Sequence, residues 1–224
     1  MGTGADGGAE APATRHSPPS GRRWLALVTL AAFALRVWRL DGQGLWSDES
    51  ISLERALLPL GAMLAELPVE HAPLYFVLLN LWLRVAGATD FALRFPSLWC
   101  GVAAVPLVAA LARRTVGRRT ALTAALLLAV NPLHVWHAQD ARMYTLATCL
   151  ALAALAALAR ALRTGAARDW AGYGLAGAAT LYTHYYGGLV VAIGAVGGAL
   201  AIVRDGERRG PARAPGADAG TAQP

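Results

Sequence analysis

Long apolar runs without a single charge constrain this chain more than any other feature of its sequence. They cover residues 95–112, 121–138, 143–159 and 170–203. A helix needs about 20 predominantly apolar residues to cross a bilayer. Only 15% of the residues are charged, whereas a soluble domain usually has about 25%. Leu and Ala dominate the runs, which favours helices over barrel strands, so we predict an all-α, polytopic membrane protein.

The lengths of the runs predict about six transmembrane helices. The stretch 170–203 is too long for one ordinary span, and Thr183–Gly188 near its middle predicts a turn between two short helices. A further apolar stretch, 24–35, follows the basic pair Arg22–Arg23, as the apolar core of a signal peptide would. No small-x-small cleavage site follows it, however, which favours a transmembrane span. We expect a transmembrane domain over 22–203 between disordered tails at 1–21 and 204–224. The predicted spans lie near 24–40, 95–112, 121–138, 143–160, 170–183 and 187–203.

Arginine clusters between the runs predict the orientation, because short cytoplasmic loops are enriched in basic residues. If 71–87 crossed the membrane, every cluster after it would fall outside. If 71–87 instead lies on the outer surface as an amphipathic interfacial helix, all clusters are cytoplasmic. The second arrangement predicts a plasma-membrane protein with both termini in the cytoplasm. The clusters are Arg22–Arg23, Arg113–Arg119, Arg160–Arg168 and Arg204–Arg213.

This orientation places three segments on the outer side, namely 41–94, 137–143 and 183–188. Adjacent carboxylates can act as a base or bind a divalent cation, and arginines can hold a phosphate. A single acid in a loop is most often only solvated, so the prediction rests on convergence at one surface. The combination suits a reaction on a lipid phosphate. The residues concerned are Asp48, Glu49, Asp140, Arg36 and Arg142.

An ordered set of short motifs resembles a known family, the GT-C glycosyltransferases. The set covers about residues 24–203, and any single element of it is weak. The closest branch is similar to the protein O-mannosyltransferases and aminoarabinose transferases. The motifs are Arg36-x-Trp38-x-Leu40, Leu45-Trp46-Ser47-Asp48-Glu49, His71-Ala72-Pro73-Leu74-Tyr75, Ala92-Leu93-Arg94-Phe95-Pro96-Ser97, Asn131-Pro132-Leu133-His134, Gln139-Asp140-Ala141-Arg142-Met143-Tyr144 and Thr183-His184-Tyr185.

The resemblance implies a function and a site. Members take a sugar from a polyprenyl- or dolichyl-phosphate donor and transfer it on the outer face with inversion at the anomeric carbon. An essential acid of the first outer loop corresponds to Asp48 or Glu49, with Asp48 favoured, and Asp140 corresponds to the second acidic site. Asp48 and Asp140 would bind a divalent metal cation if one is used. The expected substrate-binding residues are Arg36, His71, Arg142, Tyr144 and His184.

Other functions stay open at this point. The runner-up is a non-catalytic membrane module that binds a polyprenyl-phosphate lipid or a separate membrane subunit, because family members are typically much longer than this chain. A transporter is less favoured, because the spans from Phe95 onward have uncharged centres. Nucleic acid is not an expected partner, because the arginines sit in short clusters between apolar runs. The sugar, the acceptor (a lipid, glycan or protein) and the need for a metal are not fixed by the sequence.

Overall fold

A computed structural model describes residues 21–209, with side chains described for residues 21–204. This range folds entirely into helices and the turns between them, which confirms the predicted all-α class. The predicted tails lie outside the described residues except for Gly21 and 204–209, which belong to helices. The helices are α1 (Gly21–Val37), α2 (Ser47–Leu57), α3 (Leu60–Glu66), α4 (Pro73–Ala86), α5 (Asp90–Thr115), α6 (Arg118–Val130), α7 (Pro132–Ala138), α8 (Tyr144–Thr164), α9 (Ala167–Thr183) and α10 (Gly187–Arg209).

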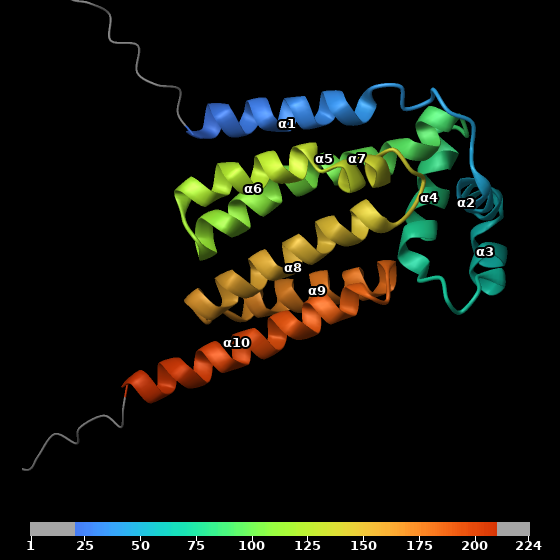
Figure 1. Cartoon of the computed structure of the whole chain (residues 1–224). Coiled ribbons are helices and arrows are strands. Elements are labelled where there is room, and N and C mark those ends of the chain that lie inside the picture. Colours follow the sequence, from blue (N-terminus) through green and yellow to red (C-terminus); the bar gives the residue numbers. More distant parts are fainter. Residues whose placement is uncertain (1–20, 210–224) are drawn as a thin grey trace, which may run out of the picture.

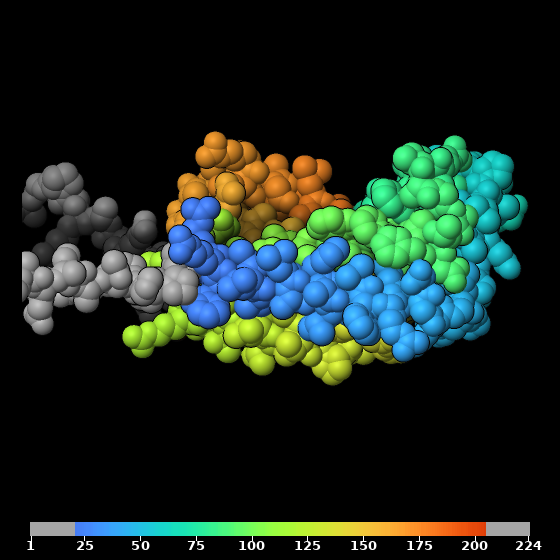
Figure 2. All heavy atoms as spheres, turned by 90° about the horizontal axis from the view of Figure 1, so that it is seen from above, coloured from blue at the N-terminus to red at the C-terminus, as the bar shows by residue number. Residues whose placement is uncertain are grey.

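The long helices form a bundle with two chemically different ends. Helices α1, α5, α6, α8, α9 and α10 run along nearly the same direction, and α2, α3 and α4 gather at one end of them (Figure 1). Figure 2 shows the same arrangement from above, with the cyan and teal segments of α2, α3 and α4 at one end of the blue helix α1. We call this the acidic end, because the first turn of α2 contains Asp48 and Glu49. The α5–α6 and α8–α9 turns lie at the opposite end, which we call the arginine end after Arg113, Arg118 and Arg163.

Within residues 21–209, three helices are long and apolar enough to cross a membrane, namely α5, α8 and α10. Helices α6 and α7 would make a fourth span if they are counted as one span that bends by 61°. Helices α1 and α9 correspond to the other two predicted spans, and each has 17 residues, the lower limit of the usual range for a transmembrane helix. The membrane assignment is therefore supported, while the count of six stays a prediction.

The span predicted over 121–138 is not one straight helix. Asn131 is extended (φ −63°, ψ 116°) because the residue before a proline avoids the α region. Pro132 is the first residue of α7, a position where its missing backbone N–H costs no hydrogen bond within the helix. The Asn131 side chain accepts from the backbone N–H of His134 and so caps the new helix. The bend brings α7 and the loop that follows it to the acidic end.

Helix α4 packs at the acidic end rather than within the bundle. Its Tyr75, Phe76 and Leu79 are buried in an apolar cluster with Leu93 of α5 and Met143 of the α7–α8 loop. Tyr185, in the turn after α9, donates from its hydroxyl to the Val69 carbonyl just before α4 (2.9 Å). These contacts fix the α3–α4 connection beside the loops that carry the predicted site. The interfacial position of 71–87 in a membrane stays a prediction.

Arg36 differs from its predicted role, because it lies inside the bundle and is fully buried. Its guanidinium donates to the carbonyls of Ala32 and Ala129 (both 3.0 Å) and Leu128 (3.2 Å), and contacts Nδ1 of His134 at 2.9 Å. The break at Asn131 frees the last carbonyls of α6, and a helix end needs such donors when it is buried. Arg36 therefore stabilises the α6–α7 bend, and we no longer count it among the substrate-binding candidates.

We expect Arg36→Met to lower the free energy of unfolding by about 2–4 kcal/mol, because it leaves buried carbonyls without donors. Arg23→Met, at the exposed start of the same helix, is the matched control and should change it by less than about 0.5 kcal/mol. Denaturant unfolding of the detergent-solubilised chain measures both. Equal effects of the two substitutions would contradict the bridging role of Arg36.

Candidate active site

Asp48 lies in the first turn of α2, where helix N-termini favour negative charge. Its side chain is 40% exposed, and one of its oxygens lies 3.5 Å from a terminal nitrogen of Arg142. Arg142 comes from the α7–α8 loop and is largely buried. A carboxylate that is both accessible and oriented by a buried cation can accept a proton from an approaching hydroxyl group.

Glu49, the next residue, has a different environment. It is buried and forms a bidentate ion pair with Arg94 of α5 (2.7 Å to Nε and 2.6 Å to a terminal nitrogen). It also accepts from the backbone N–H of Ala141 at 2.9 Å. Arg94 further donates to the carbonyls of Leu40, Gln43 and Gly44. This cluster joins α2, α5 and the α7–α8 loop, and it leaves Glu49 without a free oxygen for chemistry.

Asp140 follows α7 and is almost fully buried. One carboxylate oxygen accepts from the indole N–H of Trp46 at 3.1 Å, while Oδ2 has no partner among the described residues. Burial raises the pKa of this carboxyl to about 6, and the negative charges of Glu49 and Asp48 act in the same direction, against the Trp46 hydrogen bond and Arg142. Asp140 therefore offers one free oxygen and titrates near neutral pH.

Two histidines from other loops complete the surroundings of Arg142. Burial lowers the pKa of His71, and the positive charges of Arg55 and Arg142 lower it further, against Glu70 and Asp48. Burial also lowers the pKa of His184, followed by the charge of Arg142. Both imidazoles are thus neutral at pH 7, and Nδ1 of His71 accepts a hydrogen bond from Arg55 at 3.2 Å, which leaves the other ring nitrogen of His71 as a donor. The ring of Tyr144 lies against His184, with 5.7 Å between centroids.

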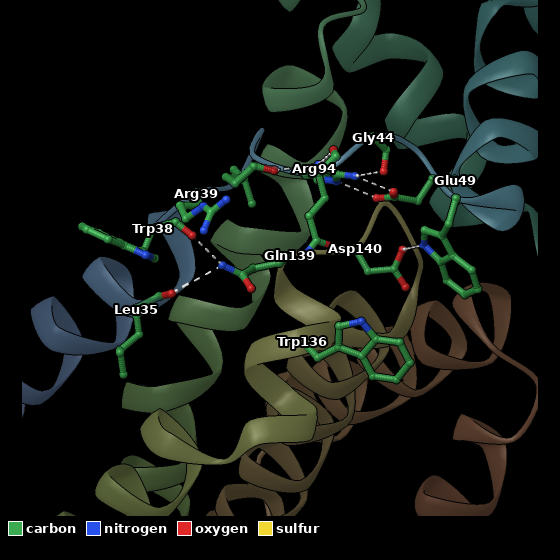
Figure 3. A pocket seen from close by; sticks show the side chains of 12 residues that line it. Leu35, Trp38, Arg39, Gly44, Glu49, Arg94, Trp136, Gln139 and Asp140 are labelled. Atoms are coloured by element: carbon green, nitrogen blue, oxygen red, sulfur yellow. Dashed lines mark hydrogen bonds and ion pairs between the residues drawn. The ribbon is translucent and has the colours of Figure 1, made fainter.

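A pocket of about 570 Å³ opens beside these residues, between the end of α1, α7 and the start of α5. This volume lies within the usual range for small-molecule sites. Figure 3 shows Asp140 and Trp136 on one side of the pocket and Arg39 and Trp38 on the other. Glu49 and Arg94 close it beside Gly44. The lining residues are Leu35, Trp38, Arg39, Leu40, Gln43, Gly44, Trp46, Glu49, Arg94, Trp136, Gln139 and Asp140.

The structure brings most of the predicted site residues into one region of the acidic end. Asp48, Asp140, Arg142, Tyr144, His71 and His184 are linked by the contacts and charges above. Arg36 lies apart from this group, with His134 and the α6 carbonyls. Glu49 is next to the group but is engaged by Arg94.

The acids provide only part of a metal site. Over residues 21–204, no group of three or more His, Cys, Asp or Glu side chains is arranged to hold a metal ion. Of the three acids of the site, Asp48 and Asp140 each have an oxygen without a hydrogen-bond partner among the described residues, whereas Glu49 does not. Mg²⁺ is often bound by one or two carboxylates plus substrate phosphates. A divalent cation at Asp48 and Asp140 would therefore need oxygens from a bound phosphate.

Several residues of the site were missed by the sequence reasoning. Arg94 had a visible signal, since an arginine directly precedes the apolar run 95–112. Trp46 and Trp136 gave no signal of their own, because tryptophans are common near membrane surfaces. Gln139 caps the end of α1 through its amide nitrogen, which donates to the carbonyls of Arg36 (3.2 Å) and Trp38 (2.9 Å). That contact joins residues about 100 positions apart.

The raised pKa of Asp140 predicts a pH dependence of stability. An ordinary aspartate ionises near 3.8, so between about pH 4 and pH 6 the unfolded chain loses this proton while the folded chain keeps it. Any stability linked to Asp140 is thus fully present below about pH 4 and is lost as the pH rises through 6. We expect the native chain to lose on the order of 2–3 kcal/mol over this interval relative to Asp140→Asn. Unfolding curves of both proteins at pH 4, 5, 6 and 7 measure the difference, and parallel curves would contradict the assignment.

Comparison with known proteins gives one match. The sequence model of the dolichyl-phosphate-mannose-protein mannosyltransferase family matches residues 70–216, about two thirds of the chain. The matched part includes Asp140, Arg142, Tyr144 and His184, whereas Asp48 lies before it. No curated protein and no solved structure matches the chain.

Proposed function

Since the chain belongs to the dolichyl-phosphate-mannose-protein mannosyltransferase family, whose members are membrane glycosyltransferases of the GT-C type, we propose that it transfers a sugar from a polyprenyl-phosphate donor. The sugar is a hexose such as mannose, and the acceptor is a lipid, a glycan or a protein. The reaction takes place on the extracytoplasmic face of the plasma membrane, where the acidic end lies. The arginine end and both termini face the cytoplasm in this proposal.

The observation that carries the proposal is the contrast between Asp48 and Glu49. Asp48 is accessible and lies beside Arg142, whereas both oxygens of Glu49 are taken by Arg94 and the Ala141 backbone. A transferase of this kind needs one carboxylate that meets the acceptor, and Asp48 is the one that is free to do so. We assign Glu49 a structural role in place of the catalytic one expected from its position.

The reaction can be written with Asp48 as the general base. Asp48 accepts the proton of the acceptor hydroxyl, and the hydroxyl oxygen forms a bond to the anomeric carbon of the sugar. The bond between that carbon and the donor phosphate oxygen breaks, and its electron pair leaves with the polyprenyl phosphate. Because attack occurs opposite the leaving group, the configuration at the anomeric carbon inverts. Such base catalysis contributes about 10²–10⁴-fold to a rate.

Other residues bind and orient in this proposal. Arg142 orients Asp48 through their ion pair. The carboxyl of Asp140, which lines the pocket, accepts a hydrogen bond from a hydroxyl of the bound sugar. His71, His184 and Tyr144 border the same region and contact the substrate there. If a divalent cation binds at Asp48 and Asp140, it supplies charge neutralisation for the donor phosphate.

The test is transfer by the full chain in liposomes from polyprenyl-phosphate mannose with a labelled sugar. Transfer of label to an added acceptor preparation, with release of polyprenyl phosphate, is the expected result. Binding of the donor without turnover would favour the alternative, a non-catalytic membrane module that works with a separate subunit. Absence of both binding and turnover would contradict the two proposals together.

A further inference from the structure

Arg39 is the cation of the pocket that no acid neutralises. Arg94, the other arginine in the lining, is paired with Glu49. Arg39 forms no ion pair among residues 21–204, although it is exposed and its side chain lies on the wall facing Asp140 (Figure 3). An uncompensated guanidinium in a pocket of about 570 Å³ is suited to an anion, and above all to phosphate, which it can contact through two N–H groups.

The backbone holds Arg39 in an uncommon conformation. Its φ is 54°, the only positive φ of a non-glycine residue in the described part of the chain. The left-handed region is sparsely used by such residues, and they occur there mostly where the surroundings impose it. Arg39 accepts a backbone hydrogen bond from Gly42 at 2.9 Å. A Cβ at position 42 would lie 3.0 Å from the Arg39 Cβ and 3.2 Å from its Nε, so a larger residue there would displace the Arg39 side chain slightly.

Gln139 fixes the turn of Arg39 to the loop of Asp140. Its amide nitrogen donates to the carbonyls of Arg36 and Trp38, on the chain just before Arg39, and its neighbour is Asp140 itself. The backbone that carries Arg39 is therefore joined by hydrogen bonds to the loop that carries Asp140. The Arg39 guanidinium and the Asp140 carboxyl lie on facing walls of the pocket, where one can contact a phosphate and the other a sugar hydroxyl.

The rim of the pocket has the character of a membrane boundary. Trp38 is 73% exposed and Trp136 is 55% exposed, and tryptophans gather where lipid tails meet water. Leu35, at the end of α1, is also exposed and lines the same rim. A ligand with a phosphate group and an apolar chain would contact the Arg39 guanidinium with its phosphate and the exposed tryptophans with its apolar chain.

We propose that Arg39 binds the phosphate group of a polyprenyl-phosphate ligand in this pocket, with Trp38 and Trp136 at the point where the lipid chain leaves it. This inference rests on the proposed function and adds the position of the donor phosphate. Asp140 lines the pocket and Asp48 does not, so a sugar held at Asp140 has the phosphate on the Arg39 side. The acceptor then comes from the Asp48 side, as inversion requires.

The experiment is equilibrium binding of radiolabelled farnesyl phosphate to the full chain in nanodiscs, in competition with unlabelled farnesol or inorganic phosphate. The native chain is expected to bind farnesyl phosphate, and farnesol should compete poorly because it lacks the charge. Arg39→Gln should weaken binding by about tenfold or more, as loss of a charge-assisted contact does. Arg39→Lys, which keeps the charge, should weaken it by no more than about threefold. Arg84→Gln, an exposed arginine of α4, should leave it unchanged.

The outcomes separate this inference from the proposed function. If Arg39→Gln binds like the native chain while Arg142→Gln loses binding, the phosphate lies at Arg142; the inference fails and the proposed function stands. If inorganic phosphate competes as well as unlabelled farnesyl phosphate does, the pocket is a site for free phosphate and the lipid part of the inference is wrong. If the native chain binds no farnesyl phosphate, the proposed donor class fails. Arg39→Lys keeps the test valid if Arg39→Gln does not fold.

Discussion

Replacing Asp48 by Asn is expected to reduce sugar transfer by about 10³-fold or more, within the range that a lost general base usually costs. Asn keeps the size of the side chain but cannot accept the acceptor's proton. Binding of the donor should change much less than turnover, because Asp48 is not part of the lining of the pocket that we assign to the donor phosphate. Initial rates with labelled polyprenyl-phosphate mannose, with donor binding measured in parallel, distinguish the two effects.

The matched control for Asp48→Asn is Asp41→Asn. Asp41 is an exposed acid in the same connection between α1 and α2, and the substitution removes the same charge from the same end of the molecule. We expect its transfer rate to stay within about twofold of the native rate, since a surface substitution outside the site has little effect. A similar loss in both variants would mean that general charge, rather than proton transfer at Asp48, determines the rate.

The second large effect is on stability, at the buried pair of Glu49 and Arg94. Removing one partner leaves the other charge buried and unpaired, which typically costs about 3–5 kcal/mol. We therefore expect Glu49→Met or Arg94→Met to lower the free energy of unfolding by that amount. Arg94→Met should be at least as harmful, because the carbonyls of Leu40, Gln43 and Gly44 lose their donor as well.

The double variant Glu49→Met with Arg94→Met tests the electrostatic explanation. It leaves no unpaired charge, so it should be more stable than either single variant, as replacement of a buried pair by apolar residues often is. Arg118→Met is the control, since that arginine is exposed and forms no ion pair in the described part of the chain. Its loss should cost less than about 0.5 kcal/mol. A double variant less stable than both single variants would contradict this explanation.

Much of the fold could be predicted because apolar runs report on helices directly. The runs 95–112 and 187–203 each lie within a single helix of the structure, and the run 143–160 does so from Tyr144 onward. The run 121–138 shows where this fails, since its composition is continuous while Asn131 and Pro132 divide it. A hydropathy average over a window of residues does not detect such a break. The bend is indicated only by Pro132, because a proline disfavours the α conformation in the residue before it.

The site was predictable as far as topology brings loops together. The apolar runs, the arginine clusters and an interfacial 71–87 together predict that Asp48, Asp140, Arg142 and His184 share one surface. The roles within the group depend on partners distant in sequence, which no local pattern contains. Glu49 and Asp48 are adjacent in the chain, yet one faces Arg94 of α5 and the other faces Arg142.

Arg36 illustrates the same limit. Its position near the end of an apolar run suggested a phosphate contact, but the carbonyls released at the α6 break bind its guanidinium. Arg39, three residues later, has the free cation instead. The two differ in environment: Arg36 is buried against α6 and α7, whereas Arg39 follows the end of α1 in a turn with positive φ and is exposed.

The central claim is that the acidic end faces the outside of the cell and the arginine end faces the cytoplasm. Two exposed valines report on it, Val69 before α4 (89% exposed) and Val116 in the α5–α6 turn (71% exposed). Each would be changed to cysteine in a chain whose Cys100 and Cys149 are replaced by alanine. A membrane-impermeant maleimide added to intact cells should label Val69→Cys and should label Val116→Cys only after permeabilisation. Labelling of Val116→Cys in intact cells with Val69→Cys protected would contradict the account.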